Sequence, residues 1–167
     1  CAPLPPQAED TRASQIEIDL RVPSYNPFAA GLGNDARDLG VADLVEFRGF
    51  VSHEEVPSLL GRASCLVLAS LPTPYWEEQF GMVLVEAMAA GLPVVAARSG
   101  AIPEVLAGYG TLFAAGDWVG LADALEQGPL ATSPGARAVP DESLVRHYSS
   151  ESAAQRLRDA YTRLLSP

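Results

Sequence analysis

Residues Tyr75 to Val95 read YWEEQFGMVLVEAMAAGLPVV, and the middle of this stretch decides the fold. From Met82 to Ala90 every residue is apolar except Glu86. A helix that is apolar all round is typical of a buried helix. Burial of an unpaired carboxylate costs on the order of several kcal/mol unless a hydrogen-bond partner satisfies it. The sequence therefore predicts a buried helix that holds one carboxylate with a specific partner.

Two glycines and a proline mark the ends of this helix. Gly81 precedes the apolar run, and a glycine there lets the backbone approach another group closely. Gly91 follows the run and Pro93 comes two residues later, which is a common way for a helix to end. The predicted helix thus begins just after Phe80-Gly81 and ends before Gly91.

Two carboxylates flank the start of the helix. Glu78 precedes it, and Glu86 lies eight positions later, inside it. The first turn of a helix leaves N–H groups free and carries a partial positive charge, so it suits an anion. One helical turn is about 5.4 Å long. A ligand with a phosphate on the N–H groups of Gly81 to Val83 would offer ribose hydroxyls to Glu86 and its far end to Glu78, which describes a nucleoside-diphosphate sugar.

The two halves of this stretch carry a family resemblance. Glu78-Gln79-Phe80-Gly81, followed by EAMAAGLPVV from Glu86 to Val95, resembles the E-x7-E signature of retaining glycosyltransferases of the family-4 type. These are two-domain GT-B enzymes whose C-terminal half binds the sugar nucleotide. The resemblance implies that Glu78 contacts the hydroxyls of the donor sugar and that Glu86 holds the ribose. Both position the donor, and neither is assigned as a general base.

Further candidate site residues follow from the resemblance and from strand ends. The predicted ligand contacts in the turn and the first helical residues are Gln79, Phe80, Gly81, Met82 and Val83, with the phosphate on the N–H groups of Gly81 to Val83. The resemblance also implies that Phe50 and Val51, after the predicted strand that ends at Gly49, form the turn that contacts the base; without it they are core residues. Gly49 and Phe50 are therefore included among the candidate site residues.

Ser70 and Arg98 are candidates because each follows a predicted strand. Ser70 is either a ligand contact or an ordinary loop hydroxyl. Arg98 is either a cation for phosphate, which suits its planar guanidinium, or a surface arginine.

The whole chain alternates strand-like and helix-like segments. Strands are predicted at 15–22, 44–50, 65–70, 93–97 and 111–114. Helices are predicted at 27–40, 52–62, 102–107, 118–127 and 151–165, besides the central one, with loops at 71–79 and 129–140. Within these, Ser52 and Glu55 form a predicted capping box. Alternating strands and helices indicate a parallel sheet with ligands beyond the carboxyl ends of its strands.

The predicted fold class is therefore α/β, a Rossmann-like three-layer parallel sheet flanked by helices, which is half of a GT-B fold. Residues 1–14 are rich in proline and charge and are interpreted as a tail or linker. Residues 15–167 are interpreted as one nucleotide-sugar-binding domain.

One feature of the family is not found in the sequence. The C-terminal half of these enzymes normally opens with a strand, a Gly-Arg turn and a nearby lysine, whose cations grip the donor diphosphate. This chain has no lysine and no such strand, and no N-terminal acceptor domain is recognised in it. The expectation is an incomplete half of an enzyme, with weak diphosphate binding and little or no transfer activity in isolation.

The charge of the chain limits which kinds of partner it is expected to bind. The net charge is −10, and all 11 basic residues are arginine. An acidic surface repels nucleic acid and anionic lipid, so neither is an expected partner. Expected partners are a nucleoside-diphosphate sugar, a glycan or lipid-linked acceptor and a missing N-terminal GT-B domain. Two cysteines make no disulfide framework, and Cys65 opens an apolar run as a predicted core thiol.

No metal site or cofactor is expected, because His53 and His147 show no ligand spacing and the two cysteines are too far apart in the sequence to form a paired cluster. No run of 18 apolar residues is free of charge, glycine and proline, so no membrane span is predicted. The expected location is the cytoplasm, with peripheral attachment at the inner membrane left open.

Three functions remain open at this point. The first is the donor-binding domain of a retaining hexosyltransferase. The second is a non-catalytic module that keeps the fold and binds a partner, and the third is another GT-B-type enzyme such as a sugar-nucleotide epimerase.

Overall fold

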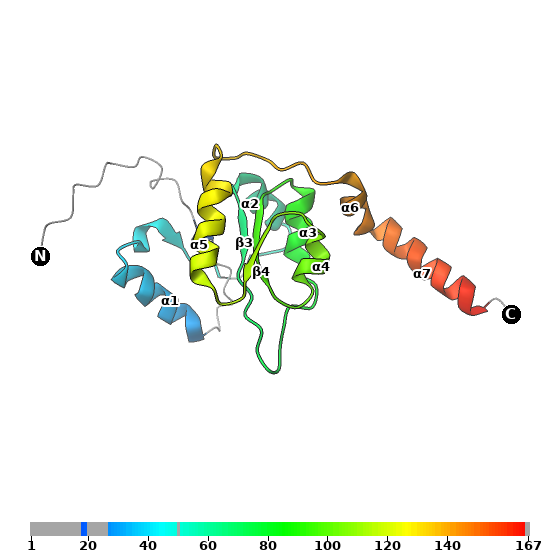
Figure 1. Ribbon diagram of the computed structural model, residues 1–167, viewed down its shortest axis with the longest axis horizontal. Coiled ribbons are helices and arrows are strands. Elements are labelled where there is room, and N and C mark those ends of the chain that lie inside the picture. The colour runs from blue at the N-terminus through cyan, green and yellow to red at the C-terminus, as the bar shows by residue number, and fades with distance from the viewer. Residues whose placement is uncertain (1–17, 20–26, 50, 166–167) are drawn as a thin grey trace, which may run out of the picture. The chain divides into compact units, whose positions relative to one another are not determined.

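The computed structural model describes residues 18–19, 27–49 and 51–165, which fall into two compact units (Figure 1). The first unit runs from Cys1 to Glu55 and the second from Val56 to Pro167. Each unit is described by itself.

The first unit contains a short parallel strand pair and one helix. Strand β1 (Ile18–Asp19) pairs in parallel with β2 (Val45–Glu46), with Ile18 opposite Val45. Helix α1 (Pro27–Asp38) lies between them in the chain and confirms the helix predicted at 27–40. The other residues of the strand predicted at 15–22 lie outside the described residues.

The strand predicted at 44–50 is wrong in its extent. Leu44 belongs to a 3₁₀ turn (Ala42–Leu44), and the strand ends at Glu46. Gly49 has a φ of +65°, a left-handed conformation outside the range of a regular strand. Sequence alternation alone does not reveal this turn.

The second unit is built on three parallel strands. Their order is β3 (Leu66–Leu68), β4 (Val94–Arg98) and β5 (Thr111–Ala114), with β4 in the middle. Its helices are α2 (Val56–Arg62), α3 (Met82–Ala89), α4 (Ile102–Leu106), α5 (Trp118–Gln127), α6 (Glu142–His147) and α7 (Ser150–Leu165). The predicted strands at 93–97 and 111–114 and the predicted helices at 102–107, 118–127 and 151–165 are confirmed. The strand predicted at 65–70 is confirmed only over Leu66–Leu68.

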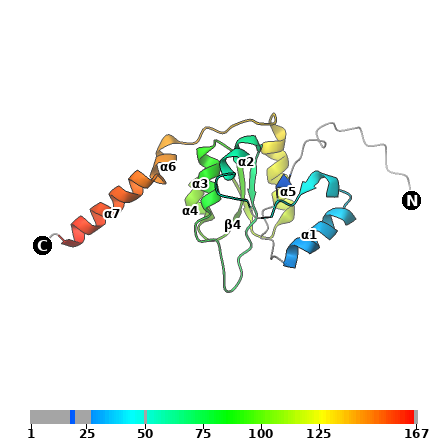
Figure 2. The ribbon, with the colours of Figure 1, turned by 180° about the vertical axis from the view of Figure 1, so that it is seen from behind.

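The central strand shows why this unit has three layers. Val94 and Ala96 pack with α2, α3 and α4, whereas Val95 and Ala97 pack with residues of α5. Successive side chains of a strand point to opposite faces of its sheet. All four are buried, and Figures 1 and 2 show α3 and α4 on one side of β4 and α5 on the other. The predicted α/β fold with a parallel sheet flanked by helices is thus confirmed.

Helix α3 has the predicted position but not the predicted burial. Leu84, Ala87 and Met88 share one helical face and are buried in the core. Met82, in the first turn, is 66% exposed. Only one face of α3 is covered, so the expectation of burial on all sides is wrong. Gly91 ends the helix as predicted, with a φ of +65°.

The helix predicted at 52–62 begins later than expected. Ser52 donates to the Glu55 carboxylate from its N–H (3.1 Å) and from its hydroxyl (2.7 Å), and these bonds lower the pKa of Glu55. The bond from the Ser52 N–H to the Glu55 carboxylate is the half of the predicted capping box in which the acid reaches back to the cap residue. The other half, a bond from a helix N–H to the Ser52 hydroxyl, is not formed among the described residues. Residues 53–55 form a turn, and α2 starts at Val56. Pro57 follows in its first turn, where a missing N–H costs no intrahelical bond.

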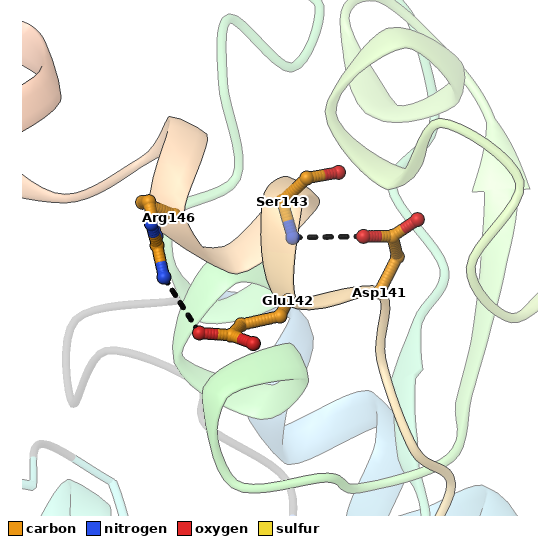
Figure 3. A network of polar contacts seen from close by, with 4 residues as sticks. All are labelled: Asp141, Glu142, Ser143 and Arg146. Atoms are coloured by element: carbon orange, nitrogen blue, oxygen red, sulfur yellow. Dashed lines mark hydrogen bonds and ion pairs between the residues drawn. The ribbon is translucent and has the colours of Figure 1, made fainter.

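Helix α6 was not predicted from the sequence. Asp141 caps it by accepting a hydrogen bond from the Ser143 N–H at 2.7 Å, and the Arg146 guanidinium pairs with the Glu142 carboxylate at 2.6 Å (Figure 3). The helix has only six residues, too few to show a helical period in the sequence.

Hydrogen bonds join the loop between α5 and α6 to the C-terminal ends of α2 and α3. It contains a 3₁₀ turn (Pro129–Ala131), within the predicted loop at 129–140. The Arg137 guanidinium donates to the carbonyls of Ala63 (2.8 Å) and Gly61 (2.5 Å), at the end of α2. The Ala138 N–H donates to the Gly91 carbonyl, just after α3, at 2.8 Å. These bonds satisfy carbonyls that a helix end leaves without partners.

Among the described residues, no helix combines the length and the apolar character needed to cross a membrane.

Candidate functional site

Glu78 lies at the entrance to α3, in the loop that follows β3. One oxygen of its half-buried carboxylate accepts a hydrogen bond from the Gly81 N–H at 3.0 Å and a longer one from the Phe80 N–H at 3.5 Å. The carboxylate therefore occupies part of the position that the sequence assigns to a ligand anion.

The backbone conformation of this turn requires a glycine at position 81. Its φ is +71°, and an added Cβ would lie 2.9 Å from a methyl group of Leu84. Its carbonyl accepts the Leu84 N–H at 2.8 Å. The expectation that the N–H of Gly81 is free is wrong, because this N–H donates a hydrogen bond to the Glu78 carboxylate. The N–H groups of Met82 and Val83 have no partner among the described residues.

The turn after β4 fixes the backbone of Glu78. The Ala101 N–H donates to the Glu78 carbonyl at 2.9 Å. Gly100 has a φ of +49°, and an added Cβ would overlap the Glu78 carbonyl oxygen and lie 2.9 Å from its carbonyl carbon. Sequence reasoning assigned no role to Gly100, although a glycine between a strand and a helix is a signal for close backbone approach. Next to it, Ser99 is buried, and its hydroxyl has no hydrogen-bond partner among the described residues.

Glu86 lies in the second turn of α3 and is half-buried, so the prediction of a fully buried carboxylate is wrong. The reason is its helical position. Residues four apart share a face, and Met82 and Ala90, on either side of Glu86 at that spacing, are both exposed. Glu86 thus lies on the less covered side of α3, the same side as Met82.

Ser70 and Arg98 lie at the carboxyl ends of β3 and β4, as predicted. Ser70 follows β3 by two residues and is half-buried. Arg98 is the last residue of β4; its side chain is exposed and makes no ion pair with another described residue. Neither contacts the Glu78–Gly81 turn through a recorded bond.

The remaining predicted positions divide between the two units. Gln79 and Phe80 lie in the turn itself and are exposed, whereas Val83 is half-buried in α3. Gly49 belongs to the first unit, so it is not placed relative to these residues, and Phe50 lies outside the described residues.

The loop between β3 and α3 exposes two aromatic side chains. Tyr75 is 97% exposed and Trp76 is 51% exposed. The Thr73 hydroxyl accepts the Trp76 N–H at 3.0 Å, which shapes the tip of the loop.

Cys65 behaves as the predicted core thiol. It is half-buried against Val95, Ala97 and Phe113, and burial raises the pKa of its thiol to about 11. A thiol with so high a pKa is a poor nucleophile at neutral pH. No group of three potential metal ligands occurs in the part of the chain that the structure describes.

Parallel strands with helices on both faces, and with polar groups gathered beyond the carboxyl ends of the strands, define an α/β protein of the Rossmann-like class. The chain belongs to the family of group 1 glycosyl transferases, whose model matches residues 13–128. The family signature thus covers both units.

Individual relatives agree with this assignment. The D-inositol 3-phosphate glycosyltransferase of Streptomyces avermitilis is 35% identical over 135 residues, which are 79% of this chain and 28% of the relative. The chain therefore spans a little over a quarter of the length of that relative.

Solved structures share the fold. The Anabaena protein HepE in complex with UDP superposes with a TM-score of 0.70 at 24% identity, covering 81% of this chain and 37% of that one. The C-terminal domain of a group 1 glycosyl transferase family protein, LpcC of Francisella tularensis, gives a TM-score of 0.60 at 26% identity, covering 76% of this chain and 65% of that one.

Proposed function

We propose that the carboxyl edge of the β3–β4–β5 sheet binds a nucleoside-diphosphate sugar, and that this chain supplies the donor site for retaining hexosyl transfer to a glycan or lipid-linked acceptor. One observation carries the proposal. The entrance to α3 is held by the Glu78–Gly81 and Ala101–Glu78 hydrogen bonds, and the N–H groups of Met82 and Val83 that follow the Glu78 carboxylate have no partner among the described residues.

Each group has a distinct role in this proposal. The N–H groups of Met82 and Val83 receive the diphosphate, which a helix N-terminus favours. Glu86, one turn further along the less covered side of α3, accepts hydrogen bonds from the ribose hydroxyls. Glu78 accepts hydrogen bonds from the sugar, and Arg98 supplies positive charge toward the phosphates.

The position of Glu78 has an electrostatic consequence. Its carboxylate already binds the Gly81 N–H, so it lies next to the place where the diphosphate would sit. Two anions at one helix N-terminus repel each other, and the repulsion is strong where water is partly excluded. Glu78 therefore disfavours a bare diphosphate and favours a donor whose sugar hydroxyls satisfy its carboxylate.

The relatives support a donor rather than an acceptor role. The fold matches a protein solved with UDP and an isolated C-terminal domain of a group 1 glycosyl transferase family protein. The chain covers only 28% of the Streptomyces relative, so an acceptor domain would come from elsewhere in the complete enzyme. Little or no transfer is expected from these 167 residues alone.

Calorimetric titration to millimolar ligand tests the proposal, with UDP, UDP-glucose and GDP-mannose as probes. Glu86→Ala is expected to weaken binding of every nucleotide that the wild type binds, by about tenfold or more, because a charged hydrogen bond is worth about 1.5–3 kcal/mol. Glu78→Gln is expected to weaken the nucleotide sugar while leaving UDP unchanged or tighter.

Two exposed carboxylates serve as matched controls. Glu77→Gln and Glu104→Gln remove the same charge near the site, and neither is expected to change affinity by more than about twofold. Equal losses in the control and site variants would contradict the specific roles assigned to Glu78 and Glu86. If the wild type binds none of the probes, the donor-site proposal fails and a non-catalytic module is favoured.

A further inference from the structure

We infer that Tyr148 is a positioning residue for the entrance of α3, acting through Phe80; this inference rests on the proposed donor site. The two rings meet edge to face, with centroids 5.6 Å apart and planes at 76°. Phe80 lies between Glu78 and Gly81, the two residues joined by the capping hydrogen bond. Among the described residues of this turn, Phe80 alone makes a ring contact. Its partner, Tyr148, lies 68 positions later in the chain.

Tyr148 is itself firmly placed. Its hydroxyl donates to the Val105 carbonyl in α4 at 3.2 Å, and its ring packs against the buried core of α2, α3 and α4. Burial raises the pKa of this hydroxyl, and the charge of Glu104 acts in the same direction, so the group remains a donor at neutral pH. The ring also meets the His147 ring edge to face, with centroids 4.9 Å apart.

Two contacts hold the entrance of α3, and each involves α4 or the residue just before it. Just before α4, the Ala101 N–H holds the Glu78 carbonyl. Within α4, the Val105 carbonyl holds Tyr148, which packs on Phe80. The backbone and the aromatic side chain of one short turn are therefore tied to the same short helix from two directions.

This arrangement predicts what loss of the ring would do. Without Tyr148, Phe80 loses its edge-to-face partner, and the Ala101–Glu78 hydrogen bond remains as the contact between the turn and the start of α4. The Glu78 carboxylate and the N–H groups of Met82 and Val83 would stay in the protein but would be less well aligned. A positioning role thus predicts weaker ligand binding without the removal of any ligand contact.

Paired tyrosine variants separate positioning from general stability. Tyr148→Leu removes the ring, whereas Tyr148→Phe keeps it and removes only the hydroxyl. Tyr109 is the matched control, because it is also half-buried and its hydroxyl also donates to a backbone carbonyl, that of Leu92, at 2.9 Å. It precedes β5 and so lies at the amino ends of the strands. Melting temperatures of Tyr148→Leu and Tyr109→Leu show whether the two variants lose similar stability.

The first readout needs no ligand. Amide hydrogen exchange at Gly81 is expected to be about three- to tenfold faster in Tyr148→Leu than in Tyr109→Leu, in line with the energy of one aromatic pair. Tyr148→Phe should stay within about twofold of the wild type. Equal Gly81 exchange in the two leucine variants would overturn the inference.

The second readout is affinity for UDP-glucose and UDP. Tyr148→Leu is expected to lose about three- to tenfold in UDP-glucose affinity, with Tyr148→Phe and Tyr109→Leu close to the wild type. Unchanged affinity in Tyr148→Leu, with normal binding by the wild type, would overturn the inference. If the wild type binds neither probe, the donor-site proposal fails, and Gly81 exchange still decides whether Tyr148 holds the turn.

Discussion

Replacing Gly100 with alanine is expected to lower the free energy of unfolding of the second unit by about 3 kcal/mol or more. The new Cβ would overlap the carbonyl oxygen of Glu78 and lie 3.1 Å from its backbone nitrogen. These are backbone atoms, which cannot rotate away as a side chain can. The φ of +49° adds strain, because an L side chain rarely adopts it. Either the Ala101–Glu78 hydrogen bond breaks or the entrance of α3 moves.

Gly135→Ala separates the two causes of this loss. Gly135 also has a positive φ, +77°, but nothing lies within 4 Å of an added Cβ. Its substitution should cost only about 1 kcal/mol, which is the backbone strain alone. Chemical denaturation of both variants measures the difference. Similar losses in the two variants would contradict the close approach of Gly100 to Glu78.

Leu84→Ala is expected to produce the second large effect, a loss of about 2–5 kcal/mol in the free energy of unfolding. Leu84 is fully buried in the core of α2, α3 and α4 and lies beneath Gly81. Its removal leaves a cavity under the turn that carries Glu78, so weaker nucleotide binding should accompany the loss of stability.

Met82→Ala is the control on the same helix. Met82 lies two residues earlier and is 66% exposed, so its truncation should change stability by less than about 0.5 kcal/mol. Thermal and denaturant unfolding of both variants tests the assignment of faces on α3. A larger loss for Met82→Ala than for Leu84→Ala would mean that the buried face of α3 is wrongly assigned.

The sequence predicted best where several local signals agreed. The stretch from Met82 to Gly91 combines an apolar run, a starting glycine and a stopping glycine, and its helix was confirmed within one residue. The β5 strand and helix α5 were predicted with their observed ends, because turn residues bound each of them.

Other features depend on contacts that a sequence does not show. An apolar helix does not reveal which of its faces is covered, so Glu86 was predicted to be more buried than it is. The predicted bond between Ser52 and Glu55 forms, but residues 53–55 make a turn and α2 starts only at Val56. The approach of Gly100 to Glu78 and of Tyr148 to Phe80 joins residues 22 and 68 positions apart. The position of Gly100 signals a close backbone approach, but no local pattern identifies the partner in either contact.

The most direct test of the donor-site proposal is a map of backbone amide shifts of the ¹⁵N-labelled chain during titration with UDP-glucose. The proposal predicts saturable shifts that are largest at Met82, Val83 and Glu86, and their loss in Glu86→Ala. Shifts confined to the opposite edge of the sheet, around Gly91 and Ala138, or no saturable shift at millimolar ligand, would contradict it.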